Sequence, residues 1–277
     1  MEAEIILKEA VSRLELAGVP DAAWDAAELM EWAGGPARSE WPLWEGELSG
    51  EVKSRFEEGV RLRQQRVPLQ HIIGKTCFMG LPFIVNEKVL CPRPDTELLA
   101  ELVIDYVNKK HPEKAEILDL CCGSGCLGVS LAHFLPNANV TLSDISEEAL
   151  KVCRRNAEAN GLLSRCQIKK GDMFETLSGR FDLIVCNPPY IPEAEIADLM
   201  PEVRDHEPKE ALSGGGDGLD FYRILAEKAP AFSEVLFLEI GCEQAEAVKE
   251  IFSEAGWRTG KIYQDLAGLD RAAVIMR

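Results

Sequence analysis

Four consecutive residues, Asn187-Pro188-Pro189-Tyr190, could hold an –NH2 group of a substrate. They follow an apolar, β-branched run at 181–186 that has the pattern of a buried strand. Proline lacks a backbone N–H and pushes the preceding residue toward an extended conformation, so Asn187 is expected in a stiff turn just past that strand. Open α/β sheets bind ligands at this edge. The carbonyls of the turn and the Asn187 side-chain oxygen would then be acceptors for an –NH2 group.

A second group of residues could bind a ligand that contains a nucleoside. The turn at 119–125 follows an apolar segment and opens a helix, so its glycines let the backbone approach a ligand closely. Asp144 ends the next predicted strand, where a carboxylate can accept both hydroxyls of a ribose. Asp172-Met173 ends a third, where an acceptor and a polarizable thioether can frame an adenine. The candidate cofactor-binding residues are Asp119, Cys121, Cys122, Gly123, Ser124, Gly125, Asp144, Asp172, Met173 and Asn187.

The charge of this second group separates two kinds of cofactor. A carboxylate after the second strand is typical of NAD sites, but the turn lacks the G-x-G-x-x-G spacing that admits a pyrophosphate. Asp119 would repel a pyrophosphate and could bind an ammonium group. A ligand with adenosine at one end and an amino acid at the other fits this layout. S-adenosylmethionine is such a ligand, and we expect it as the cofactor.

Three segments of different pattern must position these residues. Residues 1–75 are predicted to form a helical domain. Residues 76–92 are predicted as a hairpin linker, with β-rich pieces at Ile72-Ile73 and 83–85 as its strands. Residues 93–277 alternate strands and helices, which predicts an α/β domain with a parallel sheet covered by helices on both faces.

Within these segments several helix starts and one cluster of aromatic residues stand out. Helices are expected up to Gly18, from Asp21 to Ala33 and from Glu51 to about Gln65. In the α/β segment, the predicted N-caps are Asp95 or Thr96 for the first helix and Ser146 for a later one. Four of the five tryptophans, at 24, 32, 41 and 44, fall in the helical segment. They are expected to be core residues, with a docking surface for a protein partner as the alternative.

Composition excludes several classes of protein. The net charge of −17 disfavours binding that depends on phosphate neutralisation, and neither 1–75 nor the remainder is basic. The nine cysteines are scattered and match no metal-ligand spacing, so reduced thiols and no metal are expected. No apolar run approaches the roughly 20 residues that cross a bilayer, and the first four residues lack a basic signal-peptide start. We expect a cytoplasmic protein.

In this order, the Asp119 turn, Asp144, Asp172-Met173 and Asn187-Pro188-Pro189-Tyr190 resemble class I S-adenosylmethionine-dependent methyltransferases that act on planar –NH2 groups. The flanking motifs resemble one family among them, the release-factor glutamine methyltransferases (HemK/PrmC). These motifs are PLQHIIG at 68–74, VLCPRPDTE at 89–97, NPPYIP at 187–192, Glu207-Pro208, Ala211-Leu212, GGDGL at 215–219 and DLAGLDR at 265–271.

The resemblance implies a Rossmann-like seven-stranded methyltransferase sheet and a small helical N-terminal domain for substrate recognition, joined by a β-hairpin. It implies methyl transfer to the side-chain N5 of the glutamine in the Gly-Gly-Gln motif of class 1 peptide chain release factors. No direct nucleic-acid or membrane partner is then expected. Two alternatives stay open: an adenine-N6 methyltransferase acting on nucleic acid, and a non-catalytic adaptor with the same fold.

Two positions depart from the family pattern. The family usually has glycine where this chain has Cys121 and commonly tryptophan where it has Met173. Because cysteine has a Cβ, we expect ordinary φ and ψ angles at Cys121 and therefore an unstrained turn. Met173 would still cover one face of an adenine.

For catalysis, an amide nitrogen is a poor nucleophile because its lone pair is delocalised into the carbonyl. The hypothesis is that the Asn187 side-chain oxygen and the Pro188 carbonyl each accept one N–H of the substrate amide. Tyr190 would pack beside the substrate or hold the turn. Asn187, Pro188 and Tyr190 are thus the candidate catalytic residues, and all four of the turn are candidate substrate-binding residues.

Overall fold

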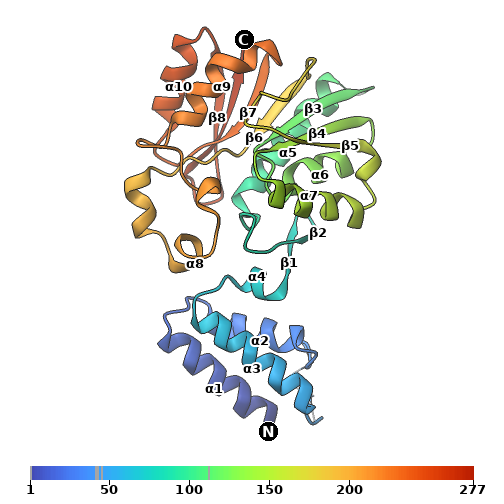
Figure 1. Ribbon diagram of the computed structural model, residues 1–277, viewed down its shortest axis with the longest axis vertical. Coiled ribbons are helices and arrows are strands. Elements are labelled where there is room, and N and C mark those ends of the chain that lie inside the picture. The colour runs from blue at the N-terminus through green and yellow to red at the C-terminus, as the bar shows by residue number, and fades with distance from the viewer. Residues whose placement is uncertain (1, 41–43, 45, 112) are drawn as a thin grey trace. The chain divides into compact units, whose positions relative to one another are not determined.

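A computed structural model describes residues 2–40, 44, 46–111 and 113–277 (Figure 1). The chain divides into two compact units. A helical unit comprises residues 1–75 together with 200–206, and a sheet unit comprises residues 76–199 and 207–277. Among the described residues, every helix is too short or too polar to cross a membrane.

The helical unit contains the three predicted helices and two shorter ones. They are α1 Glu2–Leu16, α2 Ala22–Trp32, α3 Gly50–Gln64, α4 Leu69–Ile73 and α8 Pro201–Arg204. Ser49 caps α3 by accepting a hydrogen bond from the Val52 N–H. Asp21, where the sequence predicts the start of this helix, occupies the N-cap position of α2, but its side chain accepts no capping hydrogen bond. Buried side chains of α1, α2 and α3, such as Leu14, Leu29 and Phe56, form one core.

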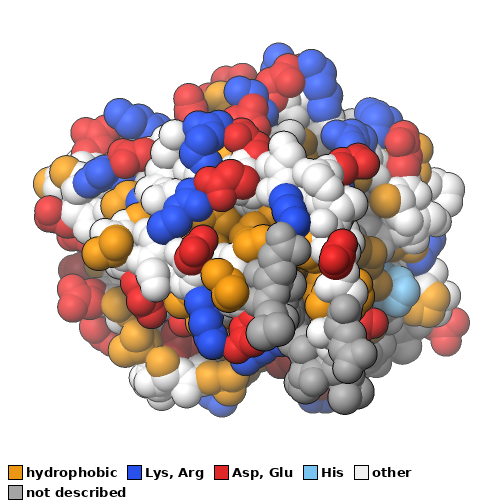
Figure 2. All heavy atoms as spheres, turned by 90° about the horizontal axis from the view of Figure 1, so that it is seen from below, with side chains coloured by type: hydrophobic (Ala, Val, Ile, Leu, Met, Phe, Trp, Pro, Cys, Tyr) orange, Lys and Arg blue, Asp and Glu red, His pale blue; other side chains and the backbone are white. Residues whose placement is uncertain are grey.

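The tryptophans of this unit correct one prediction. Trp24 is 51% exposed and Trp44 is 36% exposed, so these two are not core residues. Trp24 stacks under the Arg38 guanidinium at 4.9 Å, and Trp41 lies outside the described residues. The described side chains on the face drawn in Figure 2 mix hydrophobic groups with charges of both signs.

A buried ion network joins α8 to this unit. The Arg63 guanidinium donates to Asp25 Oδ2 at 2.6 Å and to Glu202 Oε1 at 2.7 Å. Arg66 adds two further bonds to the Glu202 carboxylate, each 2.6 Å long. Because Arg63, Asp25 and Glu202 are all buried, this network holds a segment that is 139 residues away in sequence from Arg63.

The hairpin differs from its predicted strands. Strands β1 Lys75–Phe78 and β2 Leu81–Ile84 form a two-stranded sheet, whereas Ile72 and Ile73 lie in helix α4, so that part of the prediction is wrong. The buried Asn156 amide fixes β2 to the sheet unit: it accepts from the Ile84 N–H at 2.6 Å and donates to the Ile84 carbonyl at 3.0 Å.

The sheet unit contains a seven-stranded sheet with the order β5-β4-β3-β6-β7-β9-β8. Its strands are β3 Ala115–Leu120, β4 Ala138–Asp144, β5 Cys166–Lys170, β6 Leu183–Cys186, β7 Val235–Glu239, β8 Arg258–Gln264 and β9 Asp270–Met276. The first five strands in spatial order are parallel, and β9 and β8 are antiparallel to their neighbours. Sequence patterns missed β8, an edge strand of mostly exposed polar residues.

Helices cover both faces of this sheet (Figure 1). Alternate strand residues point to opposite faces, so Ile117 packs toward α5–α7 and Leu118 toward α9 and α10. These helices are α5 Asp95–Lys110, α6 Cys126–Phe134, α7 Glu147–Ala159, α9 Asp220–Lys228 and α10 Ala245–Glu254. The 3-10 helices are η2 Leu163–Arg165, η3 Glu193–Asp198, η4 Lys209–Ala211 and η5 Ala229–Ala231.

The predicted N-caps have different outcomes. Ser146 caps α7, since its hydroxyl accepts from the Ala149 N–H at 3.2 Å. Helix α5 has Pro94 at its N-cap position, so Asp95 and Thr96 lie inside the helix and that prediction is wrong. The Thr96 hydroxyl forms its hydrogen bonds elsewhere.

The ion network leads to a stability prediction. Glu202→Ala removes the carboxylate that Arg66 bonds and one of the two carboxylates that the buried Arg63 bonds, and we expect it to destabilise the helical unit by about 3 kcal/mol. Urea unfolding followed by tryptophan fluorescence measures this, because four of the five tryptophans lie in residues 1–75. The matched control is Glu58→Ala, which removes an exposed ion pair with Arg61. The urea concentration at the midpoint of unfolding should not change in this variant. Equal midpoints for the two variants would contradict a structural role of the network.

Candidate active site

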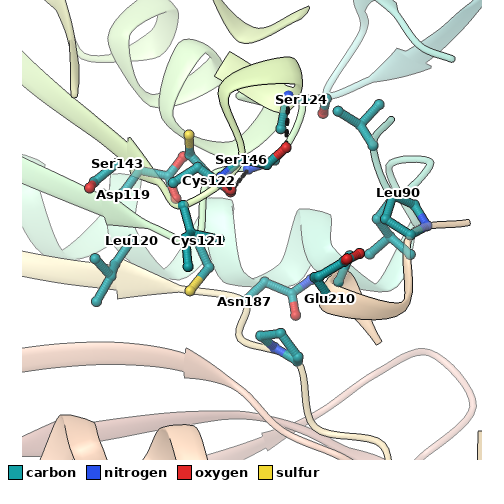
Figure 3. Close-up of a pocket in the computed structure, with 18 of the residues that line it drawn as sticks. Leu90, Asp119, Leu120, Cys121, Cys122, Ser124, Ser143, Ser146, Asn187 and Glu210 are labelled. Atoms are coloured by element: carbon teal, nitrogen blue, oxygen red, sulfur yellow. Dashed lines mark hydrogen bonds between the residues drawn. The ribbon is translucent and has the colours of Figure 1, made fainter. Parts of the chain in front are cut away.

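A cavity of about 620 Å³ lies within the sheet unit at the carboxyl ends of β3, β4 and β6. Its size is typical of small-molecule sites. Figure 3 shows Asp119, Cys121 and Cys122 toward one side of the cavity, and Leu90 and Glu210 toward the other, with Asn187 between them. The predicted residues that line it are Asp119, Cys121, Cys122, Gly123, Ser124, Asp144, Asp172, Met173, Asn187 and Pro189. Three predicted residues, Gly125, Pro188 and Tyr190, are not among the lining residues.

Asp119 is a buried carboxylate without a basic partner among the described residues. It is 1% exposed, and its Oδ2 accepts a hydrogen bond from the Gly128 N–H at 2.8 Å. A Cβ at residue 128 would lie 2.7 Å from this oxygen, so the close approach requires glycine. Burial raises the pKa of Asp119 to about 8, and the charge of Asp144 acts in the same direction. A ligand that brings an ammonium group would supply the missing positive charge.

Asp144 ends β4 and organises the glycine turn. Its Oδ2 accepts from the Gly123 N–H at 2.8 Å, and its Oδ1 accepts from the Ser146 N–H at 2.9 Å. Burial raises the pKa of Asp144, and these backbone hydrogen bonds partly oppose that shift. Each carboxylate oxygen can accept more than one hydrogen bond. Asp144 can therefore also accept hydrogen bonds from the hydroxyls of a ribose.

Cys121 contradicts the expectation of an unstrained turn, and the backbone at Met173 is strained in the same way. Cys121 has φ +60° and Met173 has φ +48°, both in the left-handed region. The reversal at Cys121 lets the next N–H, that of Cys122, donate to the Ser143 carbonyl at 3.0 Å, which ties the turn to β4. Non-glycine residues in this region cost on the order of 1 kcal/mol each. The two side chains touch, with 3.8 Å between Cys121 Sγ and Met173 Sδ.

The remaining turn residues contribute backbone and packing more than side-chain chemistry. Gly125 has φ +77° at the N-cap of α6, and a Cβ there would lie 2.6 Å from Cys153 Sγ. The hydrogen bond between the Cys122 and Cys153 thiols, together with burial, raises the pKa of Cys122 well above its usual value. Burial raises the pKa of Cys126 to about 12. The thiols of Cys122 and Cys126 are therefore neutral, so the charge beside the turn depends on the carboxyl groups of Asp119 and Asp144.

The substrate turn reaches the cavity through Asn187. Its Nδ2 donates to Thr96 Oγ1 at 3.3 Å, while its Oδ1 has no hydrogen-bond partner among the described residues. The Pro188 carbonyl is likewise not used in any hydrogen bond within the described chain. Tyr190 turns away from the cavity, and its hydroxyl donates to Glu239 Oε1 at 3.2 Å. These contacts favour the reading in which Tyr190 holds the turn.

Sequence reasoning missed two residues behind Asn187. The Thr96 hydroxyl donates to Glu239 Oε2 at 2.6 Å, and Glu239 is 3% exposed at the end of β7. Burial raises the pKa of Glu239, while the Thr96 hydrogen bond and the charge of Arg271 oppose the shift. The only signal in the sequence is a carboxylate directly after the apolar run 235–238.

Comparisons with known proteins show the family to which the chain is similar. The PrmC N-terminal domain family matches residues 6–74, and the methyltransferase small domain family matches residues 95–218. Proteins named release factor glutamine methyltransferase from Cereibacter sphaeroides and Moorella thermoacetica are 41% and 39% identical, each over 98% of this chain and 97% of the relative. The protein of that name from Geobacter sulfurreducens is 44% identical over 76% of this chain and 74% of its own.

Solved structures agree on the fold. A methyltransferase from Pyrococcus furiosus has a TM-score of 0.53 at 20% identity and covers 72% of this chain and 90% of that one. The catalytic domain of hMettl16, in complex with an RNA hairpin of the MAT2A 3'UTR, has a TM-score of 0.57 at 16% identity, over 79% of this chain and 81% of its own.

The seven-stranded sheet, the matched methyltransferase domain, and the carboxylates Asp119 and Asp144 at the ends of β3 and β4, with Asp172 two residues past β5, define an S-adenosylmethionine-dependent methyltransferase. The observation that tests the fit of this cofactor is Asp119, whose buried carboxylate lacks a cation that an amino-acid ammonium group would provide. The identity over nearly the whole chain narrows the class further: the protein belongs to the release factor glutamine methyltransferase family.

The raised pKa of Asp119 predicts proton release when S-adenosylmethionine binds. Below pH 8 the Asp119 carboxyl is mostly protonated and an α-amino group, with a pKa of about 8, is mostly charged. Pairing the two requires an ionised carboxylate, so at about pH 6.5 binding should release on the order of one proton. Calorimetry in buffers of different ionisation enthalpy measures this number.

Two variants separate Asp119 from the other carboxylates of the cavity. Asp119→Asn should abolish the release and weaken binding, whereas Asp172→Asn, which changes an exposed carboxylate of the same cavity, should retain the release. A release that is unchanged in Asp119→Asn would rule out the proposed pairing with the ammonium group.

Proposed function

We propose that this enzyme transfers a methyl group from S-adenosylmethionine to the side-chain N5 of the glutamine in the Gly-Gly-Gln motif of class 1 peptide chain release factors. Membership of the release factor glutamine methyltransferase family supports the substrate. One structural observation carries the chemistry: the acceptor side chain of Asn187 and the carboxylates Asp119 and Asp144 line the same cavity.

Asn187 and Pro188 would bind the two N–H groups of the substrate amide. Both acceptors are unused by the described chain, and both follow directly after β6. With one N–H held by Asn187 Oδ1 and the other by the Pro188 carbonyl, the plane of the amide is fixed and one face of its nitrogen points into the cavity. Orientation of this kind can contribute on the order of 7–11 kcal/mol when the reacting atoms meet near-attack geometry.

The two acceptors would also stabilise the positive charge that develops on the substrate nitrogen during methyl transfer. When bound, S-adenosylmethionine supplies an electrophilic methyl group on a sulfonium centre. Asn187 Oδ1 and the Pro188 carbonyl would stabilise positive charge as it develops on the substrate nitrogen, because each would direct the negative end of its dipole toward the N–H that it accepts. The methylated nitrogen is acidic, so its extra proton can pass to Asn187 Oδ1, to the Pro188 carbonyl or to water without a dedicated base.

The helical unit is the proposed recognition domain for the release factor. Its family match and the half-exposed Trp24 support this role, since aromatic side chains with both apolar and polar edges are enriched at protein interfaces.

Release factors act at the ribosome, and the cytoplasmic location expected from the sequence stays a prediction.

The adenine-N6 alternative uses the same acceptor turn. A nucleic-acid substrate calls for a surface that neutralises phosphates, whereas the chain carries a net charge of −17. We therefore place the glutamine reaction first and test the alternative in the same assay.

Asn187→Ala should lower methyl transfer to a class 1 release factor by at least 100-fold, the scale expected when one oriented hydrogen-bonding group is removed from a transition state. Its affinity for S-adenosylmethionine should change less than threefold, because Asp119 and Asp144 are intact. Transfer of a labelled methyl group measures the first effect and calorimetry measures the second. Activity within tenfold of wild type would contradict the role of Asn187.

The control variant is Asn139→Ala, which makes the same change at an exposed position of β4 and should leave both quantities unaltered. The substrate controls are a release factor with its Gly-Gly-Gln glutamine changed to alanine, and duplex DNA. Label on DNA but not on the release factor would favour the adenine reading, and no label on either would favour the adaptor reading.

A further inference from the structure

We propose that Thr96 and Glu239 are positioning residues that fix which end of the Asn187 side-chain amide faces the substrate. This inference rests on the proposed function, since it concerns how the acceptor of the glutamine amide is held. It assigns a role to two buried residues that belong to α5 and β7, outside the Asn187-Pro188-Pro189-Tyr190 turn.

The three side chains form a continuous chain of hydrogen bonds. Asn187 Nδ2 lies 3.3 Å from Thr96 Oγ1, and Thr96 Oγ1 lies 2.6 Å from Glu239 Oε2. Thr96 is 4% exposed and Glu239 is 3% exposed, so water does not compete freely for these groups. Thr96 also lines the cavity beside Asn187.

The carboxylate sets the direction of every bond in this chain. An ionised carboxylate can only accept hydrogen bonds, and 2.6 Å is the usual length of an O–H···O⁻ bond. The single Thr96 proton is therefore used on Glu239, and the Thr96 oxygen can only accept from Asn187. Only the –NH2 end of the Asn187 amide can donate, so this end faces Thr96 and Oδ1 is left for the substrate.

This orientation matters because the two ends of an asparagine amide have nearly the same shape. If the amide rotated by 180°, its –NH2 group would face the –NH2 group of the substrate glutamine, and two donors would oppose each other. A hydrophobic neighbour in place of the Thr96 hydroxyl would not distinguish the two orientations.

Glu239 also anchors the other end of the same turn. Its second oxygen, Oε1, accepts from the Tyr190 hydroxyl at 3.2 Å. Asn187 and Tyr190 are thus both held, the first through Thr96 and the second directly, by one buried carboxylate. Tyr222 fixes the backbone at the same point, since its hydroxyl donates to the Glu239 carbonyl at 2.9 Å.

A purely structural role for Thr96 would be to cap α5, and its contacts do not match that role. The N-cap position belongs to Pro94, and the Thr96 hydroxyl bonds to Glu239 and Asn187 instead of to the first turn of the helix. The Thr96 hydroxyl therefore holds the substrate turn and does not cap the helix.

The test compares Thr96→Val, Thr96→Ser and Thr141→Val in the full-length protein, with a class 1 release factor as substrate. Thr96→Val keeps the shape but removes the hydroxyl, and we expect kcat to fall about tenfold, the effect of one lost hydrogen bond. KM for the release factor and Kd for S-adenosylmethionine should stay within twofold. Thr96→Ser restores the hydroxyl and should recover kcat to within twofold of wild type.

Thr141→Val is the matched control, because it makes the same change at a buried threonine of β4 that does not line the cavity. Its kcat should equal that of wild type. Thr96→Val with unchanged kcat, or Thr96→Ser as impaired as Thr96→Val, would overturn the proposal. If Thr96→Val fails to fold, the Ser variant still decides: a loss in Thr96→Ser overturns the proposal.

A double-mutant cycle with Asn187→Ala separates positioning from general damage. If Thr96 acts through Asn187, adding Thr96→Val to Asn187→Ala should lower the residual rate less than twofold. An equal loss in both backgrounds would overturn the proposal. A wild-type enzyme that does not methylate the release factor would instead overturn the proposed function, so the two failures are distinguishable.

Discussion

The parallel pairing of β3 with both β4 and β6 determines where the chemistry of this protein can occur. Leu120 pairs with Cys186 on one side and with Ser143 on the other, so the residues that follow, Cys121, Asn187 and Asp144, emerge at one edge of the sheet. A shift of the register by one residue would turn each side chain to the opposite face. Burial of both faces of the sheet under helices makes such a shift costly, and so holds the cofactor turn and the substrate turn together.

Much of this arrangement could be predicted because the pattern is local. The mostly apolar run 117–120 and the apolar run 183–186 are buried on both faces and read directly as parallel strands, and the polar residues at or after their ends mark the functional edge. Strand β8 could not be read in the same way, because an edge strand half covered by solvent has no apolar run. Ile72 and Ile73 have strand propensity, but they pack into the helical core as part of α4.

Other features depend on contacts between distant residues. Thr96 and Glu239 are 143 positions apart, and no local pattern pairs a threonine in the first turn of one helix with the last residue of a strand. The angle at Cys121 was mispredicted for a related reason. Propensity assigns an ordinary φ to cysteine, but the turn must reverse where Cys122 bonds to β4, and the surrounding fold imposes the strained angle.

Two buried carboxylates illustrate how position decides function in this sheet unit. Asp119 and Glu239 each end a strand or lie next to its end, and burial raises the pKa of each. Glu239 is surrounded by donors, with Thr96 and Tyr190 on its two oxygens and the Arg271 charge nearby, so its bonding capacity is used within the protein. Within the described parts of the chain, Asp119 accepts a hydrogen bond only from the Gly128 N–H, and it borders the cavity. Glu239 can therefore orient other residues. The charge of Asp119, in contrast, is compensated only when a cationic ligand binds. Similar desolvation thus produces a rigid scaffold for the substrate turn at one strand end and affinity for the cofactor at another.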